Sequence, residues 1–193
     1  MKSLFQLLAE VSIDLQGYSW ALIGGLAVGI RTEPRFTRDI DLAVKVENDS
    51  QAEQLIFSLR ARKYRIAAVL EQASRDRLAT VRLLPPDDDR LIDLLFFSTG
   101  IEAMVVGSAQ ELELSPGFSA PVAKIGHLIA MKILARDDRK RPQDRLDLKA
   151  LLQSCEQSDL NQAREALTEI EKVGLNRERD LIGSLAETLE EFR

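Results

Sequence analysis

Two aspartates separated by one residue, Asp39 and Asp41, stand at the start of an apolar run. If this run is a strand, its side chains alternate between two faces, so both carboxylates project to one side and Ile40 faces a core. Like charges this close repel each other unless they are protonated, hydrogen-bonded or bridged by a cation. A glycine pair, Gly24-Gly25, closes the preceding apolar run and can present unhindered backbone N–H groups to an anion. The spacing therefore points to a site that brings a cation and phosphate groups together.

A third acid, Asp93, lies in an apolar run from Leu91 to Phe97 that is typical of a buried strand. A lone carboxylate there is costly to bury unless it is paired or bound to a metal. If this strand lies beside the strand of Asp39 and Asp41, the three carboxylates converge, and such oxygen ligands suit Mg²⁺ or Mn²⁺. Two such cations support in-line displacement of pyrophosphate from a triphosphate by a hydroxyl. A buried acid paired with an arginine is the structural alternative for Asp93.

The elements that would position these residues follow from hydrophobic periodicity and from the placement of Pro and Gly. We expect a helix over 3–16, a strand over 18–23, a helix over 26–30, a strand over 37–46, a helix capped by Ser50, strands over 64–70, 78–84 and 91–97, short strands and loops over 101–120, a helix that starts at Pro121 and ends at Ala135, and helices over 142–153, 159–172 and 177–192. The turn-rich segment 85–89 predicts an antiparallel hairpin between the strands it joins. The expected fold is α+β, with a mixed β-sheet and flanking helices over 1–120 and a C-terminal helical bundle over 121–193.

Composition excludes several classes of protein. The 193-residue chain has a formal net charge of −5, which disfavours a general nucleic-acid binder because such a protein shows a basic excess. No apolar run approaches the roughly 18 residues of a membrane span, and the amphipathic amino terminus lacks the features of a signal peptide. A single cysteine rules out an internal disulfide and fits a reducing compartment. We therefore expect a cytoplasmic protein without a membrane partner.

The glycine pair and the acids together form a family pattern. Gly24-Gly25, followed after thirteen residues by Asp39-Ile40-Asp41, resembles the signature of the polymerase-β-like nucleotidyltransferase superfamily. The later Ile92-Asp93-Leu94 resembles the third carboxylate strand of that superfamily. The helix that contains Lys132 and the segment that runs from Arg141 to Asp147 are similar to the AbiEii-type abortive-infection nucleotidyltransferases, the toxin half of bacterial toxin–antitoxin systems.

This resemblance implies a nucleotidyltransferase fold and an enzyme that moves a nucleoside monophosphate from an NTP to a hydroxyl acceptor, such as the 3′ end of a tRNA or a protein. It also implies Mg²⁺ or Mn²⁺ as cofactor and a cognate antitoxin as partner. The expected catalytic residues are Asp39, Asp41, Asp93 and Lys132, of which the three acids bind metal, and the expected nucleotide-binding residues are Gly24, Gly25, Arg38, Lys132 and Asp144. Many superfamily members carry Ser or Thr after the glycine, whereas Leu26 follows here, so phosphate binding would rest on backbone amides and on the cations Arg31, Arg35, Arg38 and Lys132.

Other interpretations stay open from the sequence. A small-molecule nucleotidyltransferase that inactivates an antibiotic would carry the same core motif, and the acidic net charge favours a cationic small acceptor. A non-catalytic nucleotide- or protein-binding module of the same fold is a further alternative. Lys132 can also be a surface lysine, and Asp144 and Asp147 can simply begin a helix, where negative charge is favourable. His127, on a helix rich in apolar residues, is expected to be structural.

Overall fold

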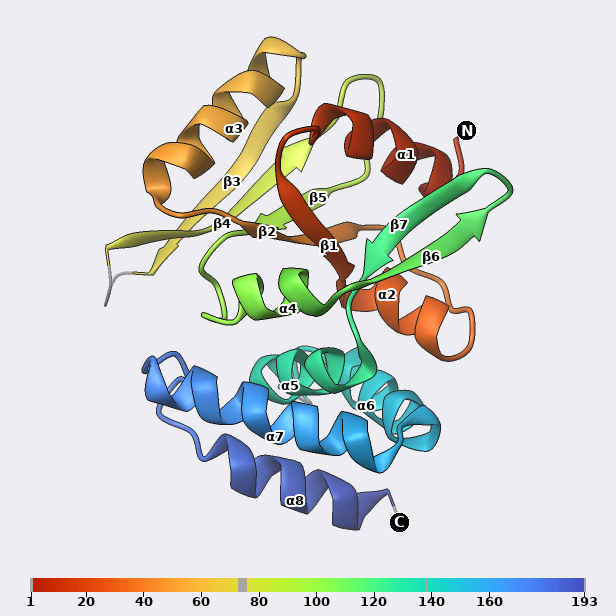
Figure 1. The fold of residues 1–193 in the computed structure, drawn as a ribbon, viewed down its shortest axis with the longest axis vertical. Helices are drawn as coiled ribbons and strands as arrows, with labels where there is room; N and C mark the ends of the chain where they lie inside the picture. Colours follow the sequence, from red (N-terminus) through yellow and green to blue (C-terminus); the bar gives the residue numbers. More distant parts are fainter. Residues whose placement is uncertain (1, 73–75, 138, 193) are drawn as a thin grey trace.

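The computed structural model describes residues 2–72, 76–137 and 139–192. These residues form a seven-stranded mixed sheet followed by a set of packed helices (Figure 1), which confirms the expected α+β class. The strands, in the order in which they pair across the sheet, are β3 (Arg65–Gln72), β4 (Arg77–Leu84), β5 (Ile92–Leu95), β2 (Ile40–Lys45), β1 (Ser19–Ile23), β7 (Phe118–Val122) and β6 (Gln110–Ser115). The helices are α1 (Leu4–Asp14), α2 (Gly24–Arg31), α3 (Asp49–Ala61), α4 (Glu102–Ser108), α5 (Ile125–Ala135), α6 (Pro142–Ser154), α7 (Gln157–Lys172) and α8 (Leu181–Glu191).

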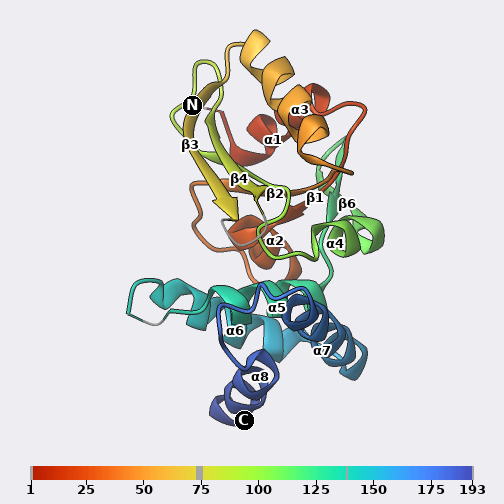
Figure 2. The same cartoon turned by 90° about the vertical axis from the view of Figure 1, so that its left-hand side faces the viewer.

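The helices cover the two faces of the sheet unequally. In both views α1 and α3 lie on one face, while α2 and α4 lie on the other, between the sheet and the helices α5 to α8 (Figures 1 and 2). The central strand β2 pairs with antiparallel β1 on one side and with parallel β5 on the other. Ile40, Leu42 and Val44 on β2 are fully buried, as the alternation predicted, so this strand is fixed within the core. Among the described residues, no helix has the length and apolar character needed to cross a bilayer.

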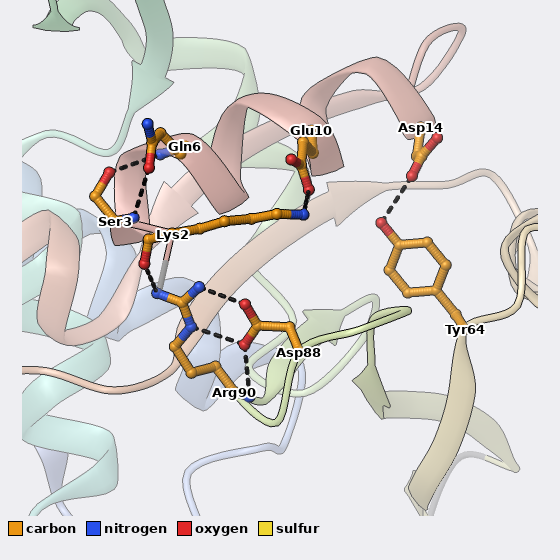
Figure 3. A network of polar contacts seen from close by, with 8 residues as sticks. All are labelled: Lys2, Ser3, Gln6, Glu10, Asp14, Tyr64, Asp88 and Arg90. Carbon is orange, nitrogen blue, oxygen red and sulfur yellow. Dashed lines mark hydrogen bonds and ion pairs between the residues drawn. The ribbon is translucent and has the colours of Figure 1, made fainter.

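Polar contacts hold α1 against the sheet at both of its ends (Figure 3). At the amino end, Ser3 and the side chain of Gln6 form a capping box, and Arg90 donates to the backbone carbonyl of Lys2 at 3.0 Å. At the carboxyl end, the Tyr64 hydroxyl donates to Asp14 at 2.7 Å. These contacts fix the loop before β5, which contains Arg90, relative to α1, and so help to place the strand that carries Asp93.

The segment 101–120 differs from the expectation of short strands and loops. Residues 102–108 form α4, and only the rest of the segment forms the β6–β7 hairpin, whose turn contains Gly117 at a positive φ of 79°. Val105 of α4 is fully buried against the core. A helix this short is not stable by itself, so tertiary packing decides its conformation where the local sequence is ambiguous.

Pro121 is a strand residue and not the first residue of a helix, which corrects the expectation from the sequence. It lies within β7 and pairs with Glu111 of β6, while α5 starts only at Ile125. Proline is tolerated there because β7 contacts its other neighbour, β1, through a single register pair, Leu22 with Val122. The sheet therefore extends to Val122, and the division into domains at residue 120 remains a prediction.

The cap of α3 and the start of β2 are two further corrections. Asn48, not Ser50, precedes α3, and its side-chain oxygen accepts from the Gln51 amide at 3.0 Å. The strand β2 begins at Ile40, so Asp39 lies in the loop immediately before it and not within the strand. The helix expected over 177–192 begins only at Leu181, because residues 177–180 form the turn before it. The remaining expected helices and strands are present with small shifts at their ends.

Candidate active site

Charged residues lie side by side on three neighbouring strands in the middle of the sheet. Asp41 on β2 is in direct register with Asp93 on the parallel strand β5, and Asp93 is in register with Arg82 on β4. On its other side Asp41 pairs with Ile23 of β1, the residue before Gly24. The strands of Asp41 and Asp93 thus lie side by side, as the sequence analysis required, and the line of residues in register leads from two acids to the amino end of α2.

The Asp41 carboxyl group lies in an environment that disfavours its charged form. Burial raises its pKa from 3.8 to about 6, and the charges of Asp93 and Asp39 act in the same direction. The positive charges of Lys132 and Arg141 act against this rise without cancelling it. A carboxylate with this balance of charges is stabilised by an added cation, so its surroundings favour metal binding.

The Asp93 carboxylate is already held by an arginine. Arg82 donates from Nε to Oδ1 at 2.8 Å and from Nη2 to Oδ2 at 2.7 Å, a bidentate geometry. The structural alternative raised for Asp93 is therefore present. Within the part of the chain that the structure describes, no group of three or more His, Cys, Asp or Glu side chains is arranged to hold a metal ion. Asp39 and Asp41 fit a divalent cation by donor type and charge, whereas Asp93 would join them only by sharing or releasing an oxygen now bound to Arg82.

The glycine pair opens α2 and supports the acids directly. Gly24 has a φ of +65°, and a Cβ atom there would lie 1.9 Å from Asp41 Oδ2, so the Asp41 carboxylate lies against the bare Gly24 backbone. A Cβ on Gly25 would lie 2.3 Å from Arg35 Nη2. Ile23 before the helix provides no side-chain cap, which leaves the first-turn N–H groups of α2 without a side-chain acceptor in the described chain. Each glycine is thus needed for close approach by a different functional side chain.

We expect Gly24→Ala to lower the rate of nucleotidyl transfer by about 100-fold, because the new methyl group must displace the Asp41 carboxylate. Gly17→Ala is the matched control, since Gly17 also has a positive φ, of 92°, but has nothing within 4 Å of the added Cβ. Both variants should lose about 1–2 kcal/mol from backbone strain. Urea unfolding and transfer rates, measured side by side, should show an activity loss in Gly24→Ala alone; equal rates in the two variants would contradict this account.

Lys132 lies between two buried acids of α6. Its Nζ is 2.6 Å from Asp144 Oδ1 and 2.8 Å from Asp147 Oδ2, and the two acid side chains are 3% and 0% exposed. Asp147 also pairs with Arg35, and Asp144 pairs with Arg141. Lys132 is thus not a surface lysine, and both acids that begin α6 orient it.

A cavity of about 140 Å³ lies between this lysine and Asp41. The other expected site residues Gly25, Asp39, Asp93 and Asp144 do not line it. Its wall includes Gly24, Asp41, Lys132, Arg141 and Arg177. The structure therefore brings the amino end of α2, an acid of the sheet and cations of the helical part to one space. This cavity is the candidate active site.

Three of the cations expected to bind phosphate, Arg31, Arg35 and Arg38, do not line this cavity. Arg35 is instead ion-paired with Asp147. Arg38 is exposed and lines a separate, larger cavity of about 890 Å³ beside α1, together with Phe5, Phe36 and Arg90. Arg31 donates to the backbone carbonyls of Val122 and Ala123, both at 2.9 Å, and so ties α2 to β7. Arg31 thus has a structural contact in place of the expected one.

Sequence reasoning missed two residues of the site. Arg82 could have been found from the alternation of its strand, which turns it to the opposite face from the buried Val81 and Leu83. Arg177 comes from the turn between α7 and α8 and has no motif around it. His127, by contrast, is structural as expected: it is buried, it lies 3.2 Å from Ser108 Oγ, and burial lowers its pKa to about 4.

The chain matches a family model over nearly its whole length. The model describes a nucleotidyl transferase AbiEii toxin of a type IV toxin–antitoxin system, and it covers residues 6–191. This match confirms the resemblance drawn from the glycine pair, the acids and the Lys132 helix. A comparison with curated proteins found no match.

Solved structures give the same fold. The chain is similar to an antigenic nucleotidyltransferase-like protein from Paracoccidioides brasiliensis, with 19% identity and a TM-score of 0.52 over 94% of this chain and 91% of that one. It is also similar to the lincosamide antibiotic adenylyltransferase LnuA, solved with lincomycin bound, with 12% identity and a TM-score of 0.50 over 80% of this chain and 99% of that one. At these identities the similarity establishes a nucleotidyltransferase fold.

Proposed function

The chain belongs to the AbiEii nucleotidyltransferase toxin family, and from this premise we propose that it transfers a nucleoside monophosphate from an NTP to a hydroxyl acceptor and releases pyrophosphate. The proposed acceptor is the 3′ end of an RNA such as tRNA, or a protein hydroxyl. The proposed setting is the cytoplasm of a cell that also makes a cognate antitoxin. The nucleotidyltransferase class follows from the family; the acceptor, the metal and the toxic effect are the parts that need testing.

One observation carries the proposal: the Asp41 carboxylate lies against Gly24, in register with Asp93, on the wall of a cavity that also contains Lys132. An acid with a pKa raised to about 6 by burial and by neighbouring acids is poised to bind a cation. Phosphate groups placed at the amino end of α2 would lie beside that cation. The same space therefore accommodates both charges of a metal–triphosphate complex.

Asp39 and Asp41 would hold the divalent metal ions, and Asp93 would complete the metal site on the acceptor side. When bound, Mg²⁺ or Mn²⁺ would neutralise phosphate charge and lower the pKa of the attacking hydroxyl. The first-turn amides of Gly24 and Gly25 would bind phosphate oxygens, favoured by the helix dipole. Lys132 would contribute positive charge to the cavity, and the ion pair with Asp144 would fix its position.

In the transfer step, the acceptor oxygen forms a bond to the α-phosphorus while the bond from that phosphorus to the pyrophosphate oxygen breaks. The proton of the acceptor hydroxyl would pass to Asp93. For this, Arg82 must release or share one of the Asp93 oxygens, since its guanidinium now faces both. The bidentate contact makes Arg82 a positioning residue that fixes the orientation of the Asp93 carboxylate.

We expect the purified protein, with Mn²⁺ or Mg²⁺, to transfer label from at least one α-labelled NTP to RNA or protein in a cell extract, and to fail when EDTA removes the metal. Each of the four NTPs is tested against tRNA, total protein and the enzyme itself, with label resolved by gel electrophoresis. Retention of label transfer in EDTA would reject the metal-dependent mechanism. If no NTP gives label transfer to any of these acceptors, the proposed activity is rejected.

A second candidate acceptor, a small molecule such as an antibiotic, is favoured by the cavity of about 890 Å³ beside Arg38. Its size lies within the roughly 300–1,000 Å³ that binds drug-sized ligands. The net charge of −5 favours a cationic molecule in general. The wall of this cavity, however, carries Arg35, Arg38 and Arg90 against one acid, Asp89, so a neutral or anionic ligand would bind there more favourably. Expression in bacteria separates the two candidates: growth arrest that requires Asp41 supports the toxin, whereas drug resistance without growth arrest supports the small acceptor.

A further inference from the structure

The turn between α7 and α8 places an arginine at the candidate active site. Arg177 lies on this turn and lines the cavity of about 140 Å³ that also contains Gly24, Asp41 and Lys132. Within residues 2–72, 76–137 and 139–192, the structure gives its guanidinium no hydrogen bond or ion pair. Arg177 thus provides the cavity with a positive charge that no acid neutralises.

The turn is held in an uncommon conformation. Arg177 and Glu178 have φ values of +56° and +58°, a left-handed region that non-glycine residues rarely occupy. Arg179 binds the turn to the carboxyl end of α5, because its Nη1 donates to the carbonyls of Leu134 at 3.1 Å and Arg136 at 3.4 Å. Within the turn, the Asn176 side chain donates to the Arg179 carbonyl at 2.7 Å. The contacts of Asn176 and Arg179 therefore hold the turn that carries Arg177 beside the cavity. Backbone strain of this kind is typical of functional sites.

In the protein without a bound ligand, the surrounding charges make the position of Arg177 unfavourable for a cation. Burial lowers the pKa of Arg177, and the nearby cations Arg141 and Arg179 lower it further. The other cations of the site have acids as partners: Lys132 has Asp144 and Asp147, and Arg141 has Asp144 at 3.2 Å. An anion in the cavity would relieve the repulsion between Arg177 and Arg141 without competing for an existing ion pair of Arg177.

We infer that Arg177, together with Arg141, forms an anion subsite for the polyphosphate tail of the nucleotide, opposite the first-turn amides of α2. The inference rests on the proposed function, because it assigns the β- and γ-phosphates of the NTP to this position. The cavity is below the roughly 300 Å³ of pockets for drug-sized ligands, so it suits phosphate groups better than a whole nucleotide. The subsite also accounts for the presence of Leu26 after the glycine pair. Arg177, a cation from the helical part, would take the place of the hydroxyl that many superfamily members carry at that position.

Binding of sodium tripolyphosphate to the 193-residue chain, measured by isothermal titration calorimetry, tests this subsite without any transfer reaction. We expect Arg177→Ala to weaken tripolyphosphate affinity by about tenfold or more, as for loss of a charge-assisted contact. Arg164→Ala is the matched control: it removes one positive charge from the exposed surface of α7 and should leave the affinity unchanged. The thermal stability of Arg177→Ala should equal or exceed that of the native chain, because the substitution removes the repulsion by Arg141 and Arg179 while the positive φ at this position is unchanged.

The outcomes separate the subsite from the proposed activity. Equal tripolyphosphate affinity in Arg177→Ala and Arg164→Ala, or no binding by the native chain, overturns the subsite even if label transfer occurs. If the native chain transfers no label but its tripolyphosphate binding depends on Arg177, the subsite stands and the proposed function fails. If both hold, Arg177→Ala should raise the KM for the NTP with a smaller change in kcat.

Discussion

The Asp41→Asn variant should lose nucleotidyl transfer by on the order of 10³-fold and yet unfold at a higher urea concentration than the native chain at pH 8. The activity falls because an amide is a weaker metal ligand than a carboxylate and removes charge where the phosphates are neutralised. The stability rises because the folded protein no longer keeps an ionised acid beside Asp93 and Asp39 in a buried position. A catalytic residue that destabilises its own fold is a feature of active sites, where function and stability compete.

The stability difference should depend on pH with a defined sign. The pKa of Asp41 is 3.8 in the unfolded chain and about 6 in the folded protein, so the folded state binds the proton more tightly. Above pH 6 the ionised Asp41 carboxylate lowers the free energy of unfolding of the native chain by its full amount. This amount is about 3 kcal/mol for a pKa shift of this size, and less if solvent screens the charges. As the pH falls from 6 to 4 the folded carboxyl takes up its proton and this destabilisation disappears. The advantage of Asp41→Asn should therefore be largest at pH 8 and vanish near pH 4.

Urea unfolding followed by circular dichroism at several pH values between 4 and 8 measures this difference. Asp88→Asn is the control that should change stability in the opposite direction. Hydrogen bonds from Arg90 lower the pKa of Asp88 to about 2, so removal of the Asp88 carboxylate should destabilise the fold at pH 8. Added Mg²⁺ should raise the unfolding midpoint of the native chain and not that of Asp41→Asn. If Asp41→Asn is less stable than the native chain at pH 8, the carboxylate is not the source of repulsion described here.

The sequence carried enough information to predict the central strands, whereas the adjacency of their acids was a condition that the structure fulfils. Asp41 and Asp93 each interrupt an otherwise apolar run, which predicts two buried strands that each carry an acid. The structure shows that these strands are neighbours and that the two acids are in register. A hydrophobic pattern depends only on residues that are close in sequence, so it predicts a strand without knowledge of the rest of the fold. The bidentate contact of Arg82 with Asp93 depends on the register between β4 and β5, which the sequence alone does not specify.

Elements whose conformation depends on distant neighbours were harder to predict. The run of Met104, Val105 and Val106 in α4 favours a strand by propensity, but packing of Val105 in the core stabilises a helix. Pro121 satisfies the rule for a first helical position and also the rule for a weakly paired strand, and only the partner strand β6 decides between them. Arg177 reaches the site because Arg179 binds the end of α5, a contact without a sequence signal.

Lys132→Met should destabilise the protein by about 3–5 kcal/mol and abolish transfer. Methionine preserves the length and apolar volume of the side chain but removes the charge that lies between Asp144 and Asp147. Those carboxylates are almost completely inaccessible to water, so water cannot replace the lost ion pairs. Arg35 still contacts both oxygens of Asp147, whereas Asp144 keeps only the longer contact with the exposed Arg141 at 3.2 Å. Lys149→Met, at an exposed position of α6, removes the same charge and should change the free energy of unfolding by less than about 0.5 kcal/mol.

The double variant Lys132→Met/Asp144→Asn separates the structural contribution of Lys132 from its contribution to the reaction. Removing the charge of Asp144 should restore part of the lost stability, because one uncompensated carboxylate is gone and the two sites are coupled by direct contact. Transfer should remain abolished, since the positive charge facing the cavity is still missing. Recovery of activity together with stability would mean that Lys132 serves only to neutralise Asp144 and Asp147. Stability that recovers without activity would place the Lys132 ammonium group among the phosphate-binding charges, with the acids of α6 holding it at the distance from Asp41 that the reaction requires.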